Sequence, residues 1–153
     1  MRGITLLAIW LCALGLASPS FAETQDPAGS EERLAQDRRR LVADNLPLAE
    51  AEAKAFWPLY ARFEQDLSAL TQRRRGIINQ FGENYDDMTE TMAKQITLEQ
   101  LDYQEARLKL MKAYWPKFDK VLPPKKLARF YQIEARIRAA IDAEIAERIP
   151  LIQ

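Results

Sequence analysis

The spacing of apolar residues along the chain predicts an all-α protein built around two long helices. The first long pattern lies within residues 49–81 and skips one expected apolar position, at Arg74. Its steps of three, four and seven are typical of a helix with one apolar face. Its apolar residues are Phe56, Tyr60, Phe63, Leu67, Leu70, Ile77 and Phe81. The second pattern lies within residues 87–118, with the stripe Leu98, Leu101, Leu108, Met111, Trp115 and Phe118.

Two shorter helices are expected beside the long pair. One covers residues 31–44, with Ser30 as its N-cap. The other is opened by Pro123 and Pro124, because proline is tolerated in a first helical turn, and is stopped by Pro150. The apolar stripe of this last helix is Leu127, Phe130, Tyr131, Ile137, Ile141 and Ile145.

The ends and bends of the two long helices also have signals in the sequence. Gly82 fits the position just after the first of them. Asp87 followed by Glu90 has the spacing of a capping box at the start of the second. Pro58 and Pro116 each remove a backbone hydrogen bond and are expected to kink their helices.

Two helices of about 30 residues are each on the order of 45 Å long. A single domain of this size that contains two such rods is expected to be an elongated helical hairpin with flanking shorter helices. This thin arrangement leaves apolar surface uncovered, so the sequence favours either a homodimer or an exposed binding face.

The N-terminus has the pattern of an export signal over residues 1–22. Arg2 precedes an apolar run from Ile4 to Leu16, and Ser20 and Ala22 supply the small residues that precede a cleavage site expected after Ala22. The alternative, an uncleaved membrane anchor, needs a longer apolar run. Lipid attachment at Cys12 is disfavoured because larger residues precede that cysteine. We therefore expect a periplasmic protein, with no stable membrane insertion once the signal is removed.

The mature chain is expected to consist of a flexible leader over residues 23–30 and one helical domain over residues 31–153. The whole sequence has 153 residues, with 22 basic and 22 acidic side chains, no histidine, and one cysteine that lies within the signal. These absences exclude disulfides, thiol catalysis, Cys/His zinc sites and serine–histidine triads. The balanced charge also argues against a nucleic-acid partner.

The carboxylates do not form a recognisable catalytic or metal-binding pattern. Glu99 and Asp102 share a helix face and could bind a cation weakly, but no segment has EF-hand spacing. A hydrolase based on two carboxylates needs them in a cleft with separated pKa values, which helix surfaces rarely provide. We therefore predict a protein without enzymatic activity, cofactor or metal.

Two segments of the chain are similar to each other at an offset of 74 residues. Each has a proline-containing turn before a helix that opens with matching residues. The first segment contributes Leu48, Glu52, Phe56 and Trp57, and the second contributes Leu122, Lys126, Phe130 and Tyr131. A second similarity, between residues 56–60 and 114–118, has an offset of 58. Because the offsets disagree, two similar helix–turn solutions and an internal duplication both stay open.

The helix openings resemble the Leu-Thr-x-x-Gln motif of the Spy/CpxP-like periplasmic proteins, the LTxxQ family. In this motif the leucine precedes the cap, the threonine is the N-cap, and the glutamine bonds back to the backbone. Degraded forms occur at Leu48 with Glu52, at Met88 with Thr89, and at Leu122 with Lys126. Over residues 40–152 the chain is most similar to an uncharacterised exported branch related to that family.

The resemblance implies a hairpin of long helices, often an antiparallel dimer, with a concave face that holds unfolded client proteins without ATP. Other members of the family damp envelope-stress signalling or bind zinc. The zinc-binding members use residues such as histidine, which this chain lacks.

Two groups of residues are candidates for client binding. Arg73, Arg74 and Arg75 could form a positive rim that attracts acidic or unfolded chains, or simply a solvated face. The aromatic residues could line an open groove, although aromatic residues at helical spacing usually form a core. These aromatic candidates are Trp57, Tyr60, Phe63, Trp115 and Phe118.

The leading functional hypothesis from the sequence is an ATP-independent, chaperone-like protein that binds exposed apolar segments of envelope proteins. The alternative is a regulatory or adaptor module for an envelope-stress sensor or membrane complex, with the same fold and one specific partner. The two differ in the range of proteins that they bind.

Overall fold

The computed structural model describes residues 37–152 and is helical throughout, with no strand in that range. A short helical segment at residues 37–45 precedes three long helices: α2 (Glu50–Glu83), α3 (Glu90–Asp119) and α4 (Pro124–Arg148). The predicted all-α class with about four helices is therefore confirmed. The predicted signal, the leader and the start of the first helix lie outside the described residues.

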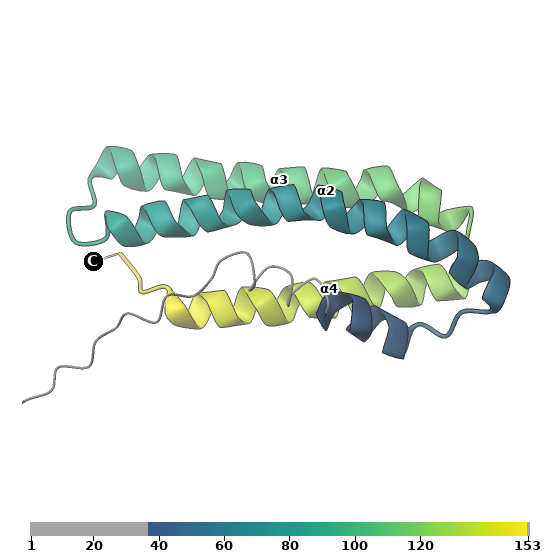
Figure 1. Cartoon of the computed structure of the whole chain (residues 1–153). Coiled ribbons are helices and arrows are strands. Elements are labelled where there is room, and N and C mark those ends of the chain that lie inside the picture. The colour runs from purple at the N-terminus through teal and green to yellow at the C-terminus, as the bar shows by residue number, and fades with distance from the viewer. Residues whose placement is uncertain (1–36, 153) are drawn as a thin grey trace, which may run out of the picture.

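Helices α2 and α3 form a long antiparallel hairpin, and α4 lies along one side of it (Figure 1). Helix α4 runs in the same direction as α2, and the short segment at residues 37–45 lies beside the N-terminal part of α4. At the opposite end, the hydroxyl of Tyr85 in the hairpin turn donates to the carbonyl of Leu151, 3.0 Å away. The C-terminal tail is thus tied to the tip of the hairpin.

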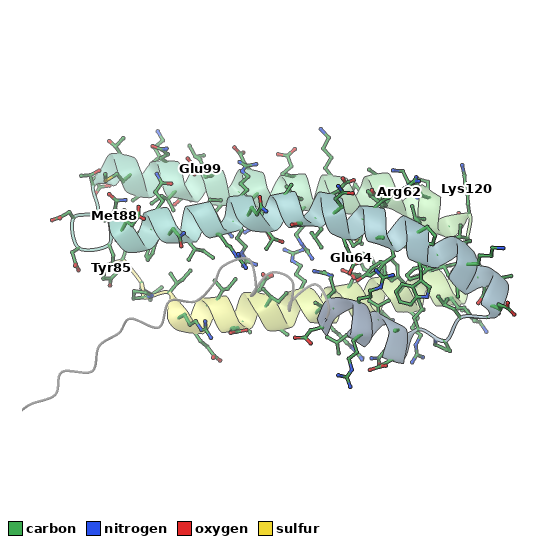
Figure 2. All side chains as sticks on the ribbon, viewed as in Figure 1. Arg62, Glu64, Tyr85, Met88, Glu99 and Lys120 are labelled. Carbon is green, nitrogen blue, oxygen red and sulfur yellow. The ribbon has the colours of Figure 1, made fainter. Side chains whose placement is uncertain are left out.

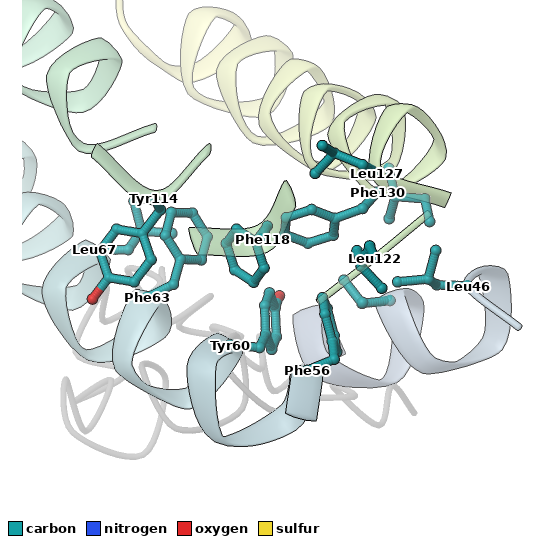
Figure 3. Packing of buried hydrophobic residues seen from close by; sticks show 12 residues of the cluster. Leu46, Phe56, Tyr60, Phe63, Leu67, Tyr114, Phe118, Leu122, Leu127 and Phe130 are labelled. Carbon is teal, nitrogen blue, oxygen red and sulfur yellow. The ribbon is translucent and has the colours of Figure 1, made fainter. Parts of the chain in front are cut away.

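The main core lies at the end where α2 and α4 begin and α3 ends (Figure 3). Its aromatic rings are in direct contact, with ring centroids 4.6 Å apart for Phe118 and Phe130 and 5.3 Å apart for Phe56 and Phe130. Edge-on and tilted contacts of this kind add to the stabilisation from burial alone. We call this cluster the aromatic core; it comprises Val42, Leu46, Phe56, Tyr60, Phe63, Leu67, Tyr114, Phe118, Leu122, Leu127, Phe130 and Ile133.

A smaller cluster joins α2 and α3 further along the hairpin. It is centred on Ile77, Ile96 and Tyr103, with Leu70 and Phe81 packed against it. The predicted apolar stripe of α2 thus faces inward along the whole helix. Both prolines lie inside their helices, and α2 curves over its N-terminal part, where Pro58 lies (Figure 1).

The predicted apolar stripe of α3 is wrong for four of its six residues. Phe118 is buried and Met111 is half-buried, but the other four are about half exposed. These four are Leu98, Leu101, Leu108 and Trp115. The face of α3 that packs on α2 carries two tyrosines instead. The hydroxyl of Tyr114 donates to Asp66 at 2.6 Å, and the ring of Tyr103 lies beneath the guanidinium of Arg74.

The predicted helix ends need two corrections. The N-cap of α3 is Thr89 rather than Asp87, since the Thr89 hydroxyl accepts a hydrogen bond from the amide of Met92 at 3.2 Å. Helix α2 continues past Gly82 to Glu83, and the side-chain amide of Asn84 donates to the carbonyl of Gln80 at 2.7 Å. The bounds of α4 agree with the prediction.

Candidate functional site

The charged residue that fixes the core end of the molecule is Glu134 of α4, which is only 2% exposed. Its carboxylate accepts hydrogen bonds from the guanidinium of Arg38, at 2.5 and 3.3 Å, and from the hydroxyl of Tyr60, at 3.0 Å. Burial, together with the nearby negative charge of Glu134, raises the pKa of Tyr60 far above its ordinary value, so its hydroxyl remains a donor. This triad joins residues 37–45, α2 and α4.

The residues of the 74-residue similarity meet across the α2–α4 contact. The Nζ of Lys126 donates to Glu52 at 2.5 Å, and Phe56 packs edge-on against Phe130. Glu52 also accepts a hydrogen bond from the backbone amide of Ala49 at 2.7 Å, so it makes the bond to the backbone that is expected of the motif's glutamine. The hydrogen bond from Lys126 and, to a smaller extent, the one from the Ala49 amide lower the pKa of Glu52. These motif positions therefore act in helix capping and packing.

The other predicted motif positions also have structural roles. Leu122 is buried in the aromatic core and Leu48 packs against it. Met88 packs against the smaller cluster, and Thr89 caps α3. The motif thus marks helix starts in this chain.

Three predicted client-binding aromatics belong to the aromatic core. Tyr60, Phe63 and Phe118 are at most 1% exposed, so they have no surface to offer a client in this structure. Trp57 is half-buried, with the guanidinium of Arg39 5.2 Å from its ring centroid. Of the five predicted aromatic candidates, Trp115 is the one with an exposed ring. This arrangement corrects the expectation of a groove lined by all five.

The arginine run at residues 73–75 does not form one positive rim. Arg73 is exposed and lies 3.8 Å from Asp102. Arg74 is largely buried, donates to Asp142 of α4 at 2.7 Å and covers Tyr103. Arg73 and Arg74 therefore have different surroundings, and Arg74 links α2 to α4.

An apolar surface runs along the outer face of α3 and continues onto α4. Its members are between 44% and 54% exposed, and the rings of Trp115 and Tyr131 are in edge-on contact with centroids 6.1 Å apart. A groove of about 270 Å³ between α3 and α4 adjoins this surface at Leu108, Met111 and Tyr131. We call the surface the apolar stripe; it comprises Leu98, Leu101, Leu108, Trp115 and Tyr131.

The two carboxylates singled out in the sequence, Glu99 and Asp102, each have a polar partner in the structure. Glu99 on α3 (Figure 2) accepts a hydrogen bond from the side chain of Gln95 at 2.9 Å. Asp102 lies 3.8 Å from Arg73. Within residues 37–152 there is no group of three or more side chains suited to holding a metal ion. In the same range no helix is both long enough and apolar enough to cross a membrane.

Comparison with known proteins finds no matching family model, no similar curated protein and no similar solved structure. The resemblance to the Spy/CpxP-like proteins therefore stays a prediction. The sequence reasoning did not identify the apolar stripe as exposed, although every one of its residues was assigned to an apolar helix face. One signal could have revealed this exposure: α3 carries two apolar stripes. A single neighbouring helix can cover only one of them, so the other is left exposed.

Proposed function

We propose that this protein is an ATP-independent, chaperone-like binder of exposed apolar polypeptide segments. The observation that carries this proposal is the apolar stripe. Five large apolar side chains lie about half exposed on α3 and α4, although the same helices already supply a complete core on their other faces. Isolated exposed leucines are ordinary, but a row of large, half-exposed apolar side chains along one helix face is typical of an interaction surface.

The shape and charge of the stripe suit partners of varied sequence. From Leu98 to Trp115 it extends for about 25 Å along one helix face. Helical spacing places Lys94, Glu105 and Lys112 on this same face, so both signs of charge interrupt the apolar residues. Binding through such a surface rests on several weak apolar contacts, and a client that buries its own apolar groups on folding is released.

The cellular setting of the proposal comes from the sequence. The export signal predicted for residues 1–22 would place the protein in the periplasm, where ATP is not needed for this kind of binding. A second copy of the chain is another partner that the stripe fits, and a homodimer would compete with clients for it. Sedimentation of the purified protein over a range of concentrations measures whether this homodimer forms.

The test is suppression of aggregation for two unrelated denatured proteins, without nucleotide and at two salt concentrations. Replacing Leu101 and Leu108 together by glutamine is expected to remove at least half of the protection at a one-to-one ratio. Leu151→Gln is the matched control, because Leu151 is exposed but lies away from the stripe. Protection is expected to depend little on salt, since the arginine run is largely engaged within the protein.

Two results would contradict the proposal. One is equal protection by the wild-type protein and by the double glutamine variant. The other is no protection at all from a folded, helical sample. The second result favours the regulatory or adaptor alternative, whose single partner would then be sought by crosslinking in the envelope.

A further inference from the structure

A separate cavity of about 320 Å³ lies between the hairpin and the C-terminal half of α4. It is bounded by residues of α2 and α3 on one side, by residues of α4 on the other, and by Asp37, Arg38 and Leu41 of the short N-terminal helical segment. Its apolar wall consists largely of branched aliphatic side chains. They include Leu67, Ile78, Ile137, Ile141 and Ile145. Pockets that hold small ligands begin at about this volume, so the cavity has room for a single short chain rather than a diacyl lipid.

Arg107 of α3 lines this cavity and is only 8% exposed. In the part of the chain that the structure describes, its guanidinium makes no hydrogen bond or ion pair. Burial and the positive charge of Arg138 both lower the pKa of Arg107. A buried cation without an anionic partner is costly, and an anion brought by a ligand would remove that cost.

The other arginines around the cavity differ from Arg107 in this respect. Arg38 is bound to Glu134, and both Arg74 and Arg138 contact Asp142. Taken together, the described residues that line the cavity include five arginines and three carboxylates. Among these described residues positive charge is thus in excess, and Arg107, unlike Arg38, Arg74 and Arg138, has no ion pair within residues 37–152.

We propose that this cavity binds an aliphatic carboxylate of intermediate length, with the carboxylate on Arg107 and the chain against the isoleucines of α4. A guanidinium matches a carboxylate with two parallel hydrogen bonds, which a point charge does not. The branched aliphatic wall suits a saturated chain. This site lies on the opposite side of the α3–α4 contact from the groove beside the apolar stripe, and Arg107 borders both.

The experiment is calorimetric titration of the purified protein with octanoate, decanoate and decan-1-ol. Decanoate is expected to bind, with affinity rising about fourfold for each added methylene until the cavity is full. Decan-1-ol has the same chain without the charge and is expected to bind at least tenfold more weakly. Decanoate binding with no dependence on chain length, or equal binding of the alcohol, would overturn the proposal.

Arg107→Gln separates the proposed contact from general apolar binding. This variant is expected to weaken decanoate binding about ten- to a hundredfold and to leave decan-1-ol binding unchanged. Arg73→Gln is the matched control, because Arg73 is on α2, exposed, and outside the cavity lining. Arg107→Lys keeps the positive charge but cannot form the two parallel hydrogen bonds. Its affinity for decanoate is expected to lie between those of the wild type and Arg107→Gln.

A second measurement keeps the test independent of binding heats. Decanoate is expected to raise the melting temperature of the wild-type protein and of Arg73→Gln, but not that of Arg107→Gln. Ile141→Trp, which fills the cavity, is expected to abolish binding of both the acid and the alcohol. Decanoate that stabilises Arg107→Gln as much as the wild type, or that binds to Ile141→Trp unchanged, would place the ligand elsewhere and overturn the proposal.

Discussion

The two parts of the space between the hairpin and α4 are built from the same helices but are filled in different ways. At the core end, aromatic rings interlock, and the buried charges of Arg38 and Glu134 neutralise each other beside Tyr60. Further along α4, the side chains are aliphatic and half-buried, a cavity remains, and Arg107 has no anionic partner among the described residues.

This difference indicates that the core end stabilises the fold, whereas the cavity end contributes less to stability. Close packing and paired buried charges are what hold three helices in a fixed arrangement, and small changes there are costly. A cavity lined by an arginine that has no anionic partner within residues 37–152 contributes little to stability, and it is the part for which we propose ligand binding. The comparison predicts that equivalent substitutions have large effects at the core end and small effects at the cavity end.

The largest contrast is expected between Phe118→Ala and Ile145→Ala. Phe118 packs against Phe56, Phe63 and Phe130, so truncation loses burial and leaves a void, at a cost of about 3–5 kcal/mol of unfolding free energy. Ile145 already borders the cavity, so its truncation is expected to cost about 1 kcal/mol. Urea unfolding followed by circular dichroism measures both, and equal costs would contradict the proposed division.

A smaller but more specific contrast is expected between Glu134→Gln and Glu144→Gln. The first variant leaves Arg38 buried without a counter-charge and is expected to cost about 3 kcal/mol. The second breaks the pair of Glu144 with Arg148, whose side chains are both exposed, and is expected to cost less than about 0.5 kcal/mol. The same urea unfolding measures the two variants side by side.

A double variant sharpens this result. Replacing Arg38 by methionine together with Glu134→Leu removes both buried charges at once, and most of the lost stability is expected to return. If Glu134→Gln costs no more than Glu144→Gln, the buried triad is not what fixes residues 37–45 and α4 against α2.

The sequence was sufficient for the fold because the long helices differ from loops in periodicity and length. For α2 it was also sufficient for the core, since only one face of that helix is apolar. Helix α3 has two apolar stripes, one through Ile96 and Phe118 and one through Leu98 and Leu108. Periodicity cannot rank two stripes of similar strength, and here the choice depends on partners that lie on other helices.

Those partners explain why tyrosines were preferred over leucines at the α2–α3 contact. The hydroxyl of Tyr114 reaches Asp66, and burial, together with this hydrogen bond, raises the pKa of Tyr114 to about 12. Tyr103 packs beneath Arg74 of α2. Such cross-helix contacts are absent from a single helix pattern.

The proposed binding surfaces were less predictable than the fold. The 74-residue similarity does coincide with the pairing of α2 and α4, through Glu52 with Lys126 and Tyr60 with Glu134. The cavity, however, is a property of three helices together. Nothing in the residues around Arg107 distinguishes it from the paired arginines, because its lack of an ion pair within the described chain depends on how α4 packs.

The last prediction concerns Glu64, which lies on α2 between the two regions and faces α4 (Figure 2). Its Oε1 is buried and has no hydrogen-bond partner among the described residues, while Oε2 lies 3.7 Å from Arg39. Burial raises the pKa of Glu64; Arg39 and Arg38 oppose this, whereas the nearby Glu134 adds to it. The folded state therefore holds this proton more tightly than the unfolded state does.

A raised carboxyl pKa makes the charged form a cost to the folded protein. The stability contributed by the proton is fully present below the ordinary carboxyl pKa of 4.5 and is lost as the pH rises through the higher folded value. Glu64→Gln is therefore expected to be more stable than the wild type at pH 7, with the advantage shrinking towards pH 4.5. Urea unfolding at a series of pH values measures the difference, and Glu144→Gln is the exposed control. A wild-type protein that is more stable than Glu64→Gln at neutral pH would mean that the pair with Arg39 outweighs burial, and that the core end extends its charge pairing as far as the cavity wall.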